Sequence, residues 1–184
     1  NDPDLLELAE THDQLSRRCQ SETVLLHEGD SENLSLWNEF MPIALREIDS
    51  VYQRLDINFD TTYGESFYHP MLEGLVEELL AKGVAVPSDG AACIFLEGFD
   101  TPMIIRKSDG AFLYATTDLA TIEYRMQHYC PDAILYVVDS RQSEHFAKLF
   151  AAARAIGYDQ VELNHISFGT VLGPDGKPFK TRSG

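Results

Sequence analysis

The chain has 184 residues, of which 44% are hydrophobic and 10% aromatic; this is enough to bury one good core and excludes a disordered polypeptide. Its 30 acidic and 14 basic side chains give a formal net charge of −16, so the chain by itself should not bind nucleic acid. The sequence contains no apolar run near the ~18 residues that a transmembrane helix needs, so no membrane association is expected.

The first third of the chain predicts two helices. Apolar residues follow a helical spacing over residues 1–20, and a break at residues 27–31 precedes a second helical pattern that includes Trp37 and Ile48. Pro42 lies inside this second pattern and should kink the helix or break it. Two acid-rich helices in succession favour a helical hairpin.

The middle of the chain predicts one helix among short strands. Residues 57–60 have the composition of a short strand, and residues 68–82 show helical spacing with Gly83 as the C-cap. Further short strands separated by turns that contain Gly and Asp predict a small antiparallel β unit. These strands cover residues 84–87, 91–96, 103–106 and 111–113.

Helices and strands alternate in the last third of the chain. The pattern predicts a helix over residues 117–129, a strand over 133–138, a helix over 141–157 and a strand over 161–168. The segment ILYVV is apolar on both faces, as a strand covered by helices on both sides requires. This alternation predicts an α/β fold with a parallel sheet.

Polar side chains follow the strands of this predicted sheet. Tyr114 and Asp118 are four residues apart where the chain enters a helix, so they can face one pocket. Gln142 starts the next helix, and ligands of open α/β sheets bind beyond the carboxyl ends of the strands. Taken alone, Asp118 is better explained by a role at the helix N-terminus, and residues 173–184 fit either a mobile basic loop or a solvated β-hairpin.

The three cysteines carry little functional signal. Cys19, Cys93 and Cys130 lie far apart and form no C-x-x-C pair, so neither a zinc site nor a disulfide framework is indicated. Reduced thiols are typical of cytoplasmic proteins, and we expect a cytoplasmic location with no protein-bound metal.

Three segments, in this order, resemble the arginyl-tRNA synthetases of bacterial type, a class I aminoacyl-tRNA synthetase family. YATTD (114–118) is similar to the family's Tyr-x-x-x-Asp element, and YVVDSRQSEH (136–145) to its strand-to-helix element with a Gln and a His. KPFKTRSG (177–184) is similar to a degenerate KMSKS loop, and LDINFDTTYGESFY upstream also resembles the family. The resemblance implies that residues 111–184 form the C-terminal half of a Rossmann-like nucleotide-binding domain. Residues 1–110 would then be a helical and small antiparallel β insertion.

The resemblance implies an arginine site at four residues. Asp118 would accept two parallel hydrogen bonds from the guanidinium, which an ammonium matches less well. Tyr114 would supply ring surface and a hydroxyl, and Gln142 would hydrogen-bond the polar groups of the amino acid. His145 shares a helix face with Gln142 and would lie near the nucleotide or the amino acid.

The resemblance also implies a nucleotide site towards the end of the chain. Phe168 and Gly169 would lie against the adenine of ATP. Lys177, Lys180 and Arg182, in the terminal loop, would neutralise the leaving pyrophosphate and so act catalytically.

The implied activity is that of an arginine–tRNA ligase. The parent enzyme would activate L-arginine with ATP and Mg²⁺ to arginyl-adenylate and then transfer the arginyl group to tRNA(Arg). The sequence contains no His-x-Gly-His pattern, the HIGH motif that class I synthetases need. We therefore expect a catalytic-domain fragment that is inactive alone. The alternative is a non-catalytic arginine- or partner-binding module derived from the synthetase fold; another class I synthetase is disfavoured by Tyr114 and Asp118.

Overall fold

The computed structural model describes residues 3–170, 172–174 and 176–177, without the side chains of residues 3–11, 13, 20, 27 and 28. The chain divides into two compact units, Asn1–Thr62 and Tyr63–Gly184. The resemblance implies a different boundary, after residue 110, between the insertion and the second half of the nucleotide-binding domain. That boundary stays a prediction. No helix in the described part of the chain is long and apolar enough to cross a membrane.

The first unit consists of the two predicted helices, α1 (Pro3–Glu28) and α2 (Ser31–Arg54). The predicted break between them is a turn at Gly29 and Asp30, and the Asp30 carboxylate accepts hydrogen bonds from the backbone N–H groups of Glu32 and Asn33, which caps α2. Helix α2 continues through Pro42, so the break considered for that position does not occur.

The strand predicted at residues 57–60 is absent. These residues are irregular, and the ring of Phe59 packs edge-on against Tyr52 of α2 with 4.8 Å between the ring centroids. The prediction was wrong because a strand needs a hydrogen-bonding partner strand, and the described part of the chain offers none to this segment.

The second unit begins with α3 (Glu65–Tyr68), a 3₁₀ turn η1 (His69–Met71) and α4 (Leu72–Ala81). The helix predicted over residues 68–82 corresponds to η1 and α4, and the short helix α3 before it was not predicted. The residue after Lys82 is Gly83, whose φ of 69° and N–H bond to the Leu80 carbonyl (3.1 Å) end the helix as expected for a C-terminal glycine.

A three-stranded antiparallel sheet follows, in the order β1 (Val86–Ser88), β2 (Ala91–Ile94) and β3 (Met103–Arg106). It is the small β unit that the turns predicted. The fourth predicted strand, residues 111–113, reduces to a single bridge between Arg106 and Phe112.

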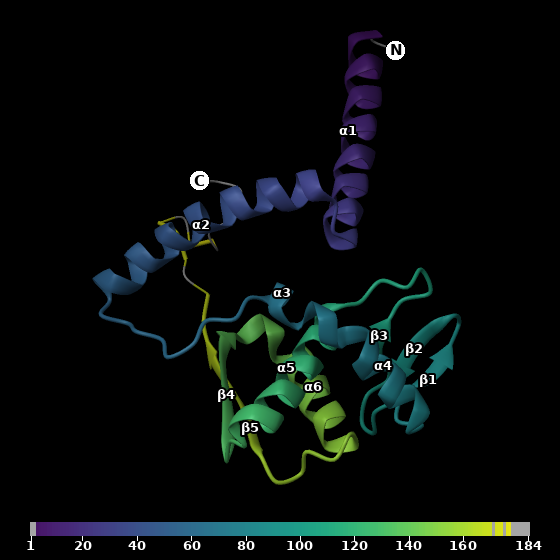
Figure 1. Cartoon of the computed structure of the whole chain (residues 1–184), viewed down its shortest axis with the longest axis vertical. Coiled ribbons are helices and arrows are strands. Elements are labelled where there is room, and N and C mark those ends of the chain that lie inside the picture. The colour runs from purple at the N-terminus through teal and green to yellow at the C-terminus, as the bar shows by residue number, and fades with distance from the viewer. Residues whose placement is uncertain (1–2, 171, 175, 178–184) are drawn as a thin grey trace. The chain divides into compact units, whose positions relative to one another are not determined.

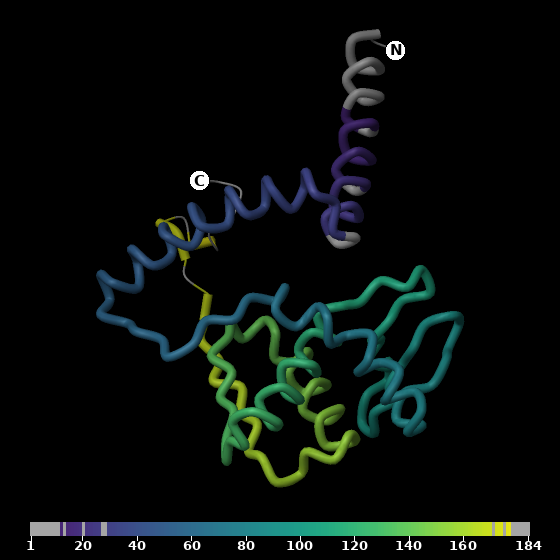
Figure 2. Tube along the Cα trace, in the orientation of Figure 1, coloured from purple at the N-terminus to yellow at the C-terminus, as the bar shows by residue number. Residues whose placement is uncertain are grey.

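The α/β part contains α5 (Tyr114–Tyr129), β4 (Ala133–Asp139), the 3₁₀ turn η2 (Ser140–Gln142), α6 (Ser143–Ala155) and β5 (Glu162–Phe168). β4 and β5 are parallel over their whole length, and Figure 2 shows the green and yellow traces side by side. Helices α5 and α6 lie next to this sheet in Figure 1. The predicted α/β class with a parallel sheet is therefore confirmed.

Helix α5 begins at Tyr114, three residues earlier than predicted, because of a buried threonine. The hydroxyl of Thr116, which is fully buried, donates to the Ile105 carbonyl of β3 and accepts from the Leu113 N–H (3.3 Å). This hydroxyl both caps α5 and ties its first turn to the antiparallel sheet.

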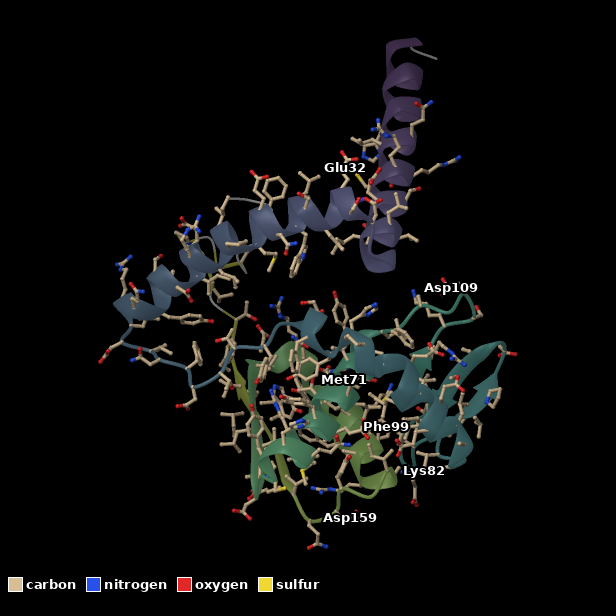
Figure 3. All side chains as sticks on the ribbon, in the orientation of Figure 1. Glu32, Met71, Lys82, Phe99, Asp109 and Asp159 are labelled. Atoms are coloured by element: carbon tan, nitrogen blue, oxygen red, sulfur yellow. The ribbon has the colours of Figure 1, made fainter. Side chains whose placement is uncertain are left out.

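One hydrophobic core holds the second unit together. It draws side chains from α4, α5, α6 and both sheets, with fully buried members such as Ile105, Leu119 and Leu149. Figure 3 shows side chains crowding between these elements, with Met71 and Phe99 labelled among the partly buried residues that pack against the core. This shared core fixes α5, α6 and β4 relative to one another, and these three elements form the site described next.

Candidate functional site

A cavity of about 600 Å³ lies between α3, α5, β4, η2 and α6 in the second unit. Helix α5 contributes one face to it, because Tyr114, Asp118, Thr121 and Arg125 follow one another at spacings of four, three and four residues. The four predicted arginine-site residues, Tyr114, Asp118, Gln142 and His145, all line this cavity.

Asp118 and His145 form the closest polar contact in the cavity. Nε2 of His145 lies 2.6 Å from Oδ2 of Asp118, and both side chains are about two-thirds buried. The imidazole also packs edge-on against Phe146, with 5.3 Å between the ring centroids. The contact orients the Asp118 carboxylate, and one of its two oxygens remains outside this bond.

Tyr114 and Gln142 lie at the exposed rim of the cavity. The Tyr114 side chain is 73% exposed, and Gln142 is also exposed at the junction of η2 and α6. Neither polar group has a hydrogen-bond partner among the described residues, so both can bind a ligand without breaking an existing bond.

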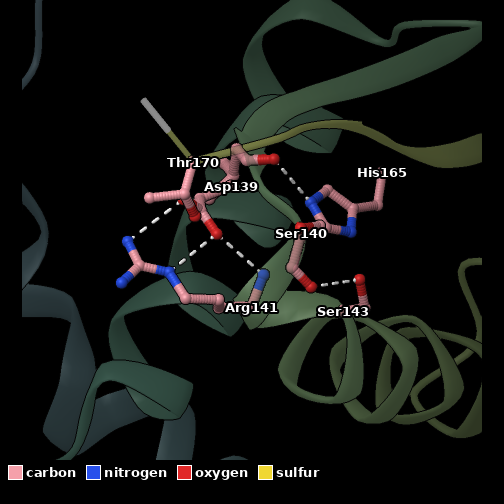
Figure 4. Close-up of polar contacts among 7 residues, drawn as sticks. Asp139, Ser140, Arg141, Ser143, His165 and Thr170 are labelled. Carbon is pink, nitrogen blue, oxygen red and sulfur yellow. Dashed lines mark hydrogen bonds and ion pairs between the residues drawn. The ribbon is translucent and has the colours of Figure 1, made fainter. Parts of the chain in front are cut away.

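The turn that carries Gln142 is held by Asp139, the last residue of β4 (Figure 4). The Asp139 carboxylate accepts from the Arg141 backbone N–H at 2.8 Å, from the Arg141 side chain at 2.9 and 3.1 Å, and from the Thr170 hydroxyl at 3.2 Å. These bonds, above all those from the Arg141 side chain, lower the pKa of Asp139 to about 2. Asp139 therefore caps the turn.

The same network reaches the segment after β5. Nε2 of His165 lies 2.9 Å from the Val138 carbonyl, which adds a side-chain bond between the parallel strands (Figure 4). Through the Asp139–Thr170 bond, the end of β4 is tied to the residue that follows Gly169. The two strand ends therefore meet at one edge of the sheet, as expected for parallel neighbours.

Two of the predicted nucleotide residues, Phe168 and Gly169, lie at this edge but outside the cavity wall. Phe168 ends β5 and is 51% exposed, and Gly169 is exposed beside it. Lys177 is exposed in a tight turn closed by a bond from the Gly173 N–H to the Lys177 carbonyl (2.8 Å). Lys180 and Arg182 fall outside the described residues.

The cavity also contains residues that the sequence analysis did not select. Arg125 continues the α5 face two turns beyond Asp118, and its guanidinium lies over the Tyr136 ring, 5.4 Å from the centroid. The Tyr136 hydroxyl is buried, and burial raises its pKa to about 12, with a smaller rise from the charge of Asp118 and an opposing effect of Arg125. Helical spacing from Asp118 could have identified Arg125; Tyr136 is the one hydroxyl in the apolar strand.

The described residues include no group of three or more His, Cys, Asp or Glu side chains able to hold a metal ion. Two carboxylates, Asp118 and Glu65, line the cavity together with the single guanidinium of Arg125. The cavity therefore offers a rigid carboxylate, hydroxyl groups and an amide, a set suited to an organic cation with several N–H donors.

Comparison with known proteins agrees with this chemistry. Residues 6–184 match the family described as tRNA synthetases class I (R), catalytic domain. Among curated relatives, an arginine–tRNA ligase of Rhodopirellula baltica is 58% identical over 100% of this chain and 27% of its own length. An arginine–tRNA ligase of Cutibacterium acnes is 46% identical over 93% of this chain and 32% of its own length. The chain thus spans about a third or less of these relatives.

Solved structures give the same result. The arginyl-tRNA synthetase of Plasmodium falciparum superposes with a TM-score of 0.78 at 28% identity, covering 90% of this chain and 30% of that one. The Thermus thermophilus arginyl-tRNA synthetase shares the fold with a TM-score of 0.69 at 19% identity, covering 91% of this chain and 34% of that one. The chain therefore belongs to the catalytic-domain family of the class I tRNA synthetases (R).

Proposed function

We propose that this chain is the part of an arginine–tRNA ligase that binds L-arginine and approaches ATP during activation. The whole protein would join L-arginine and ATP to arginyl-adenylate and transfer the arginyl group to tRNA(Arg). The observation that carries the proposal is the cavity lined jointly by Tyr114, Asp118, Gln142 and His145.

Asp118 is proposed to bind the guanidinium. A carboxylate matches the parallel N–H groups of a guanidinium, whereas the ammonium of lysine is a compact point charge. The bond from His145 supports this role, because a carboxylate already oriented loses less freedom when the ligand binds. Tyr114 and Gln142, at the rim, would contact the aliphatic stem and the α-amino or α-carboxylate group.

The nucleotide would bind at the sheet edge next to this rim. Phe168 and Gly169 are proposed to lie against the adenine, and Lys177, Lys180 and Arg182 to stabilise the leaving pyrophosphate. The arginine carboxylate attacks the α-phosphorus, the bond to the bridging oxygen breaks, and pyrophosphate leaves with Mg²⁺, which arrives with ATP as part of the substrate. Positioning and charge stabilisation are the contributions of the protein to such a reaction.

We further propose that this chain alone does not catalyse activation. The His-x-Gly-His pattern expected to contact the ATP phosphates is absent from the 184 residues. The formal charge of −16 also disfavours independent tRNA binding. The absence of any disulfide among the three cysteines is consistent with action in the cytoplasm.

Calorimetric titration tests the arginine site directly. L-arginine, L-lysine and L-citrulline are titrated into the chain and into Asp118→Asn, with Asp159→Asn as a matched control outside the cavity. The expected result is binding selective for arginine that is lost only in Asp118→Asn. Equal binding of arginine and citrulline, or an unchanged Asp118→Asn variant, would contradict the assignment.

A chimera tests the whole activity. This chain replaces the matching 184-residue segment of the Rhodopirellula baltica ligase, to which it is 58% identical. Pyrophosphate exchange that depends on L-arginine and tRNA is expected in the chimera and not in the isolated chain. A chimera that folds and binds arginine without exchange would favour the alternative, a non-catalytic arginine-binding module.

A further inference from the structure

The carboxylate of Asp139 is fully occupied by donors from this chain. Oδ1 accepts from the backbone N–H of Arg141 at 2.8 Å and from its Nε at 2.9 Å. Oδ2 accepts from Nη2 of Arg141 at 3.1 Å and from the Thr170 hydroxyl at 3.2 Å. An ionised carboxylate offers about four lone-pair sites, so these bonds use its whole accepting capacity. Asp139 therefore has no acceptor left for a ligand, and its role is to hold other groups in place.

The bonds from Arg141 and the bond from Thr170 have different effects. The bond from the Arg141 backbone N–H caps η2, and the largely exposed Arg141 side chain adds an ion pair within the same turn. The Thr170 hydroxyl comes instead from 31 positions along the chain, in the segment after β5. This bond joins two separate segments and is not required to form the turn.

The segment after β5 has little else to hold it. The parallel ladder ends at the pair Asp139 and Phe168, so Gly169 and Thr170 lie beyond the last strand pairing. Gly169 is exposed, and no atom beyond its neighbours in the chain lies within 4 Å of where its side chain would begin. Within the described residues, the Thr170 hydroxyl makes the one side-chain hydrogen bond that ties residues 168–170 to the end of β4 (Figure 4).

The two segments joined by this bond carry the two sides of the proposed reaction. Gln142, at the end of η2, is proposed to contact L-arginine, whereas Phe168 and Gly169 are proposed to lie against the adenine. The arginine carboxylate must approach the α-phosphorus to about 3–3.5 Å, and a misplacement of about 1 Å costs about 100-fold in rate. The placement of one segment against the other should therefore control the rate.

We propose that Asp139 and Thr170 are positioning residues whose hydrogen bond sets the nucleotide-binding segment after β5 against the arginine-binding turn η2. The inference rests on the proposed function and adds two residues that contact neither substrate. The bond acts on the relative placement of two bound substrates and not on the binding of L-arginine. Its loss therefore lowers kcat and leaves the affinity for L-arginine unchanged.

Kinetics of the chimera test the proposal. Thr170→Val removes the hydroxyl, Thr170→Ser keeps it, and Thr61→Val is the matched control at an exposed threonine of the first unit. In pyrophosphate exchange, Thr170→Val should lower kcat about tenfold with an unchanged KM for L-arginine, because one positioning bond is lost. Thr170→Ser and Thr61→Val should stay within about twofold of the parent chimera. An unchanged kcat in Thr170→Val, or a loss that appears only in KM, overturns the proposal.

The 184-residue chain supplies a second readout that needs no catalysis. The ¹H–¹⁵N NOE of the Gly169 amide reports motion on the picosecond-to-nanosecond timescale. It should fall in Thr170→Val and be retained in Thr170→Ser, while calorimetry shows equal binding of L-arginine to wild type and both variants. Equal NOE values in wild type and Thr170→Val would show that the hydroxyl does not hold the segment, and the proposal would fail.

The outcomes separate this inference from the proposed function. An active chimera in which Thr170→Val behaves as the parent refutes the positioning role and retains the arginine site. A chimera that folds and shows no exchange refutes the proposed function, and this inference with it.

Discussion

Asp118 of α5 and His145 of α6 are joined by a hydrogen bond of 2.6 Å between Oδ2 and Nε2, across 27 positions of sequence. The bond connects the two helices that carry the predicted arginine-site residues. It also makes His145 a partner of the carboxylate, a relationship that neither residue signals in the sequence.

Replacing Asp118 by Asn should weaken L-arginine binding at least about 100-fold, because an amide loses the charge and one of the two acceptor positions that a guanidinium requires. Calorimetry on the isolated chain measures this effect. Far-UV circular dichroism should be unchanged, since the side chain is one-third exposed and its hydrogen bond within the described part of the chain is to His145. Retention of wild-type affinity would remove Asp118 from the site.

Replacing His145 by Ala should weaken arginine binding about three- to tenfold, because the carboxylate of Asp118 loses the group that orients it. His145→Gln carries an amide N–H near the position of Nε2 and should recover most of the loss. The two variants are compared by calorimetry. An equal loss in both would show that the imidazole itself contacts the ligand.

Asp139 should give the chain an acid-sensitive turn. Its pKa of about 2 lies below the usual value of 3.8, so its hydrogen bonds stabilise the fold above pH 3.8 and this contribution is lost as the pH falls towards 2. Asp139→Asn should flatten the dependence of the urea midpoint on pH in that window. A parallel loss of stability in wild type and variant would show that other carboxylates govern acid unfolding.

Thr116→Val should destabilise the chain by about 1–3 kcal/mol, because the Ile105 carbonyl and the Leu113 N–H both lose a buried partner. Urea unfolding followed by circular dichroism measures the change. Thr116→Ser keeps the hydroxyl and removes only a methyl group, so its loss should be smaller. The reverse order of the two variants would mean that packing, not hydrogen bonding, holds the start of α5.

Local patterns predicted most elements of the second unit. The strand over residues 103–106 was predicted with the bounds that the structure shows, because turn residues flank it on both sides. The helix predicted over residues 68–82 begins in the structure with the 3₁₀ turn η1, which contains Pro70, and continues as α4. The strand at residues 57–60 failed because β structure depends on a partner, which composition does not reveal.

The sequence by itself determined that Tyr114 and Asp118 share one helix face, since helical periodicity acts over a few residues and needs no other element. Only the tertiary structure decided that His145 bonds to Asp118 and that Tyr136 lines the same cavity. Both relationships arise where α6 and β4 pack against α5 around a common core, so they depend on contacts between residues far apart in the chain. No local pattern specifies such contacts, because hydrophobic burial is non-directional and fixes partners only when the whole core assembles.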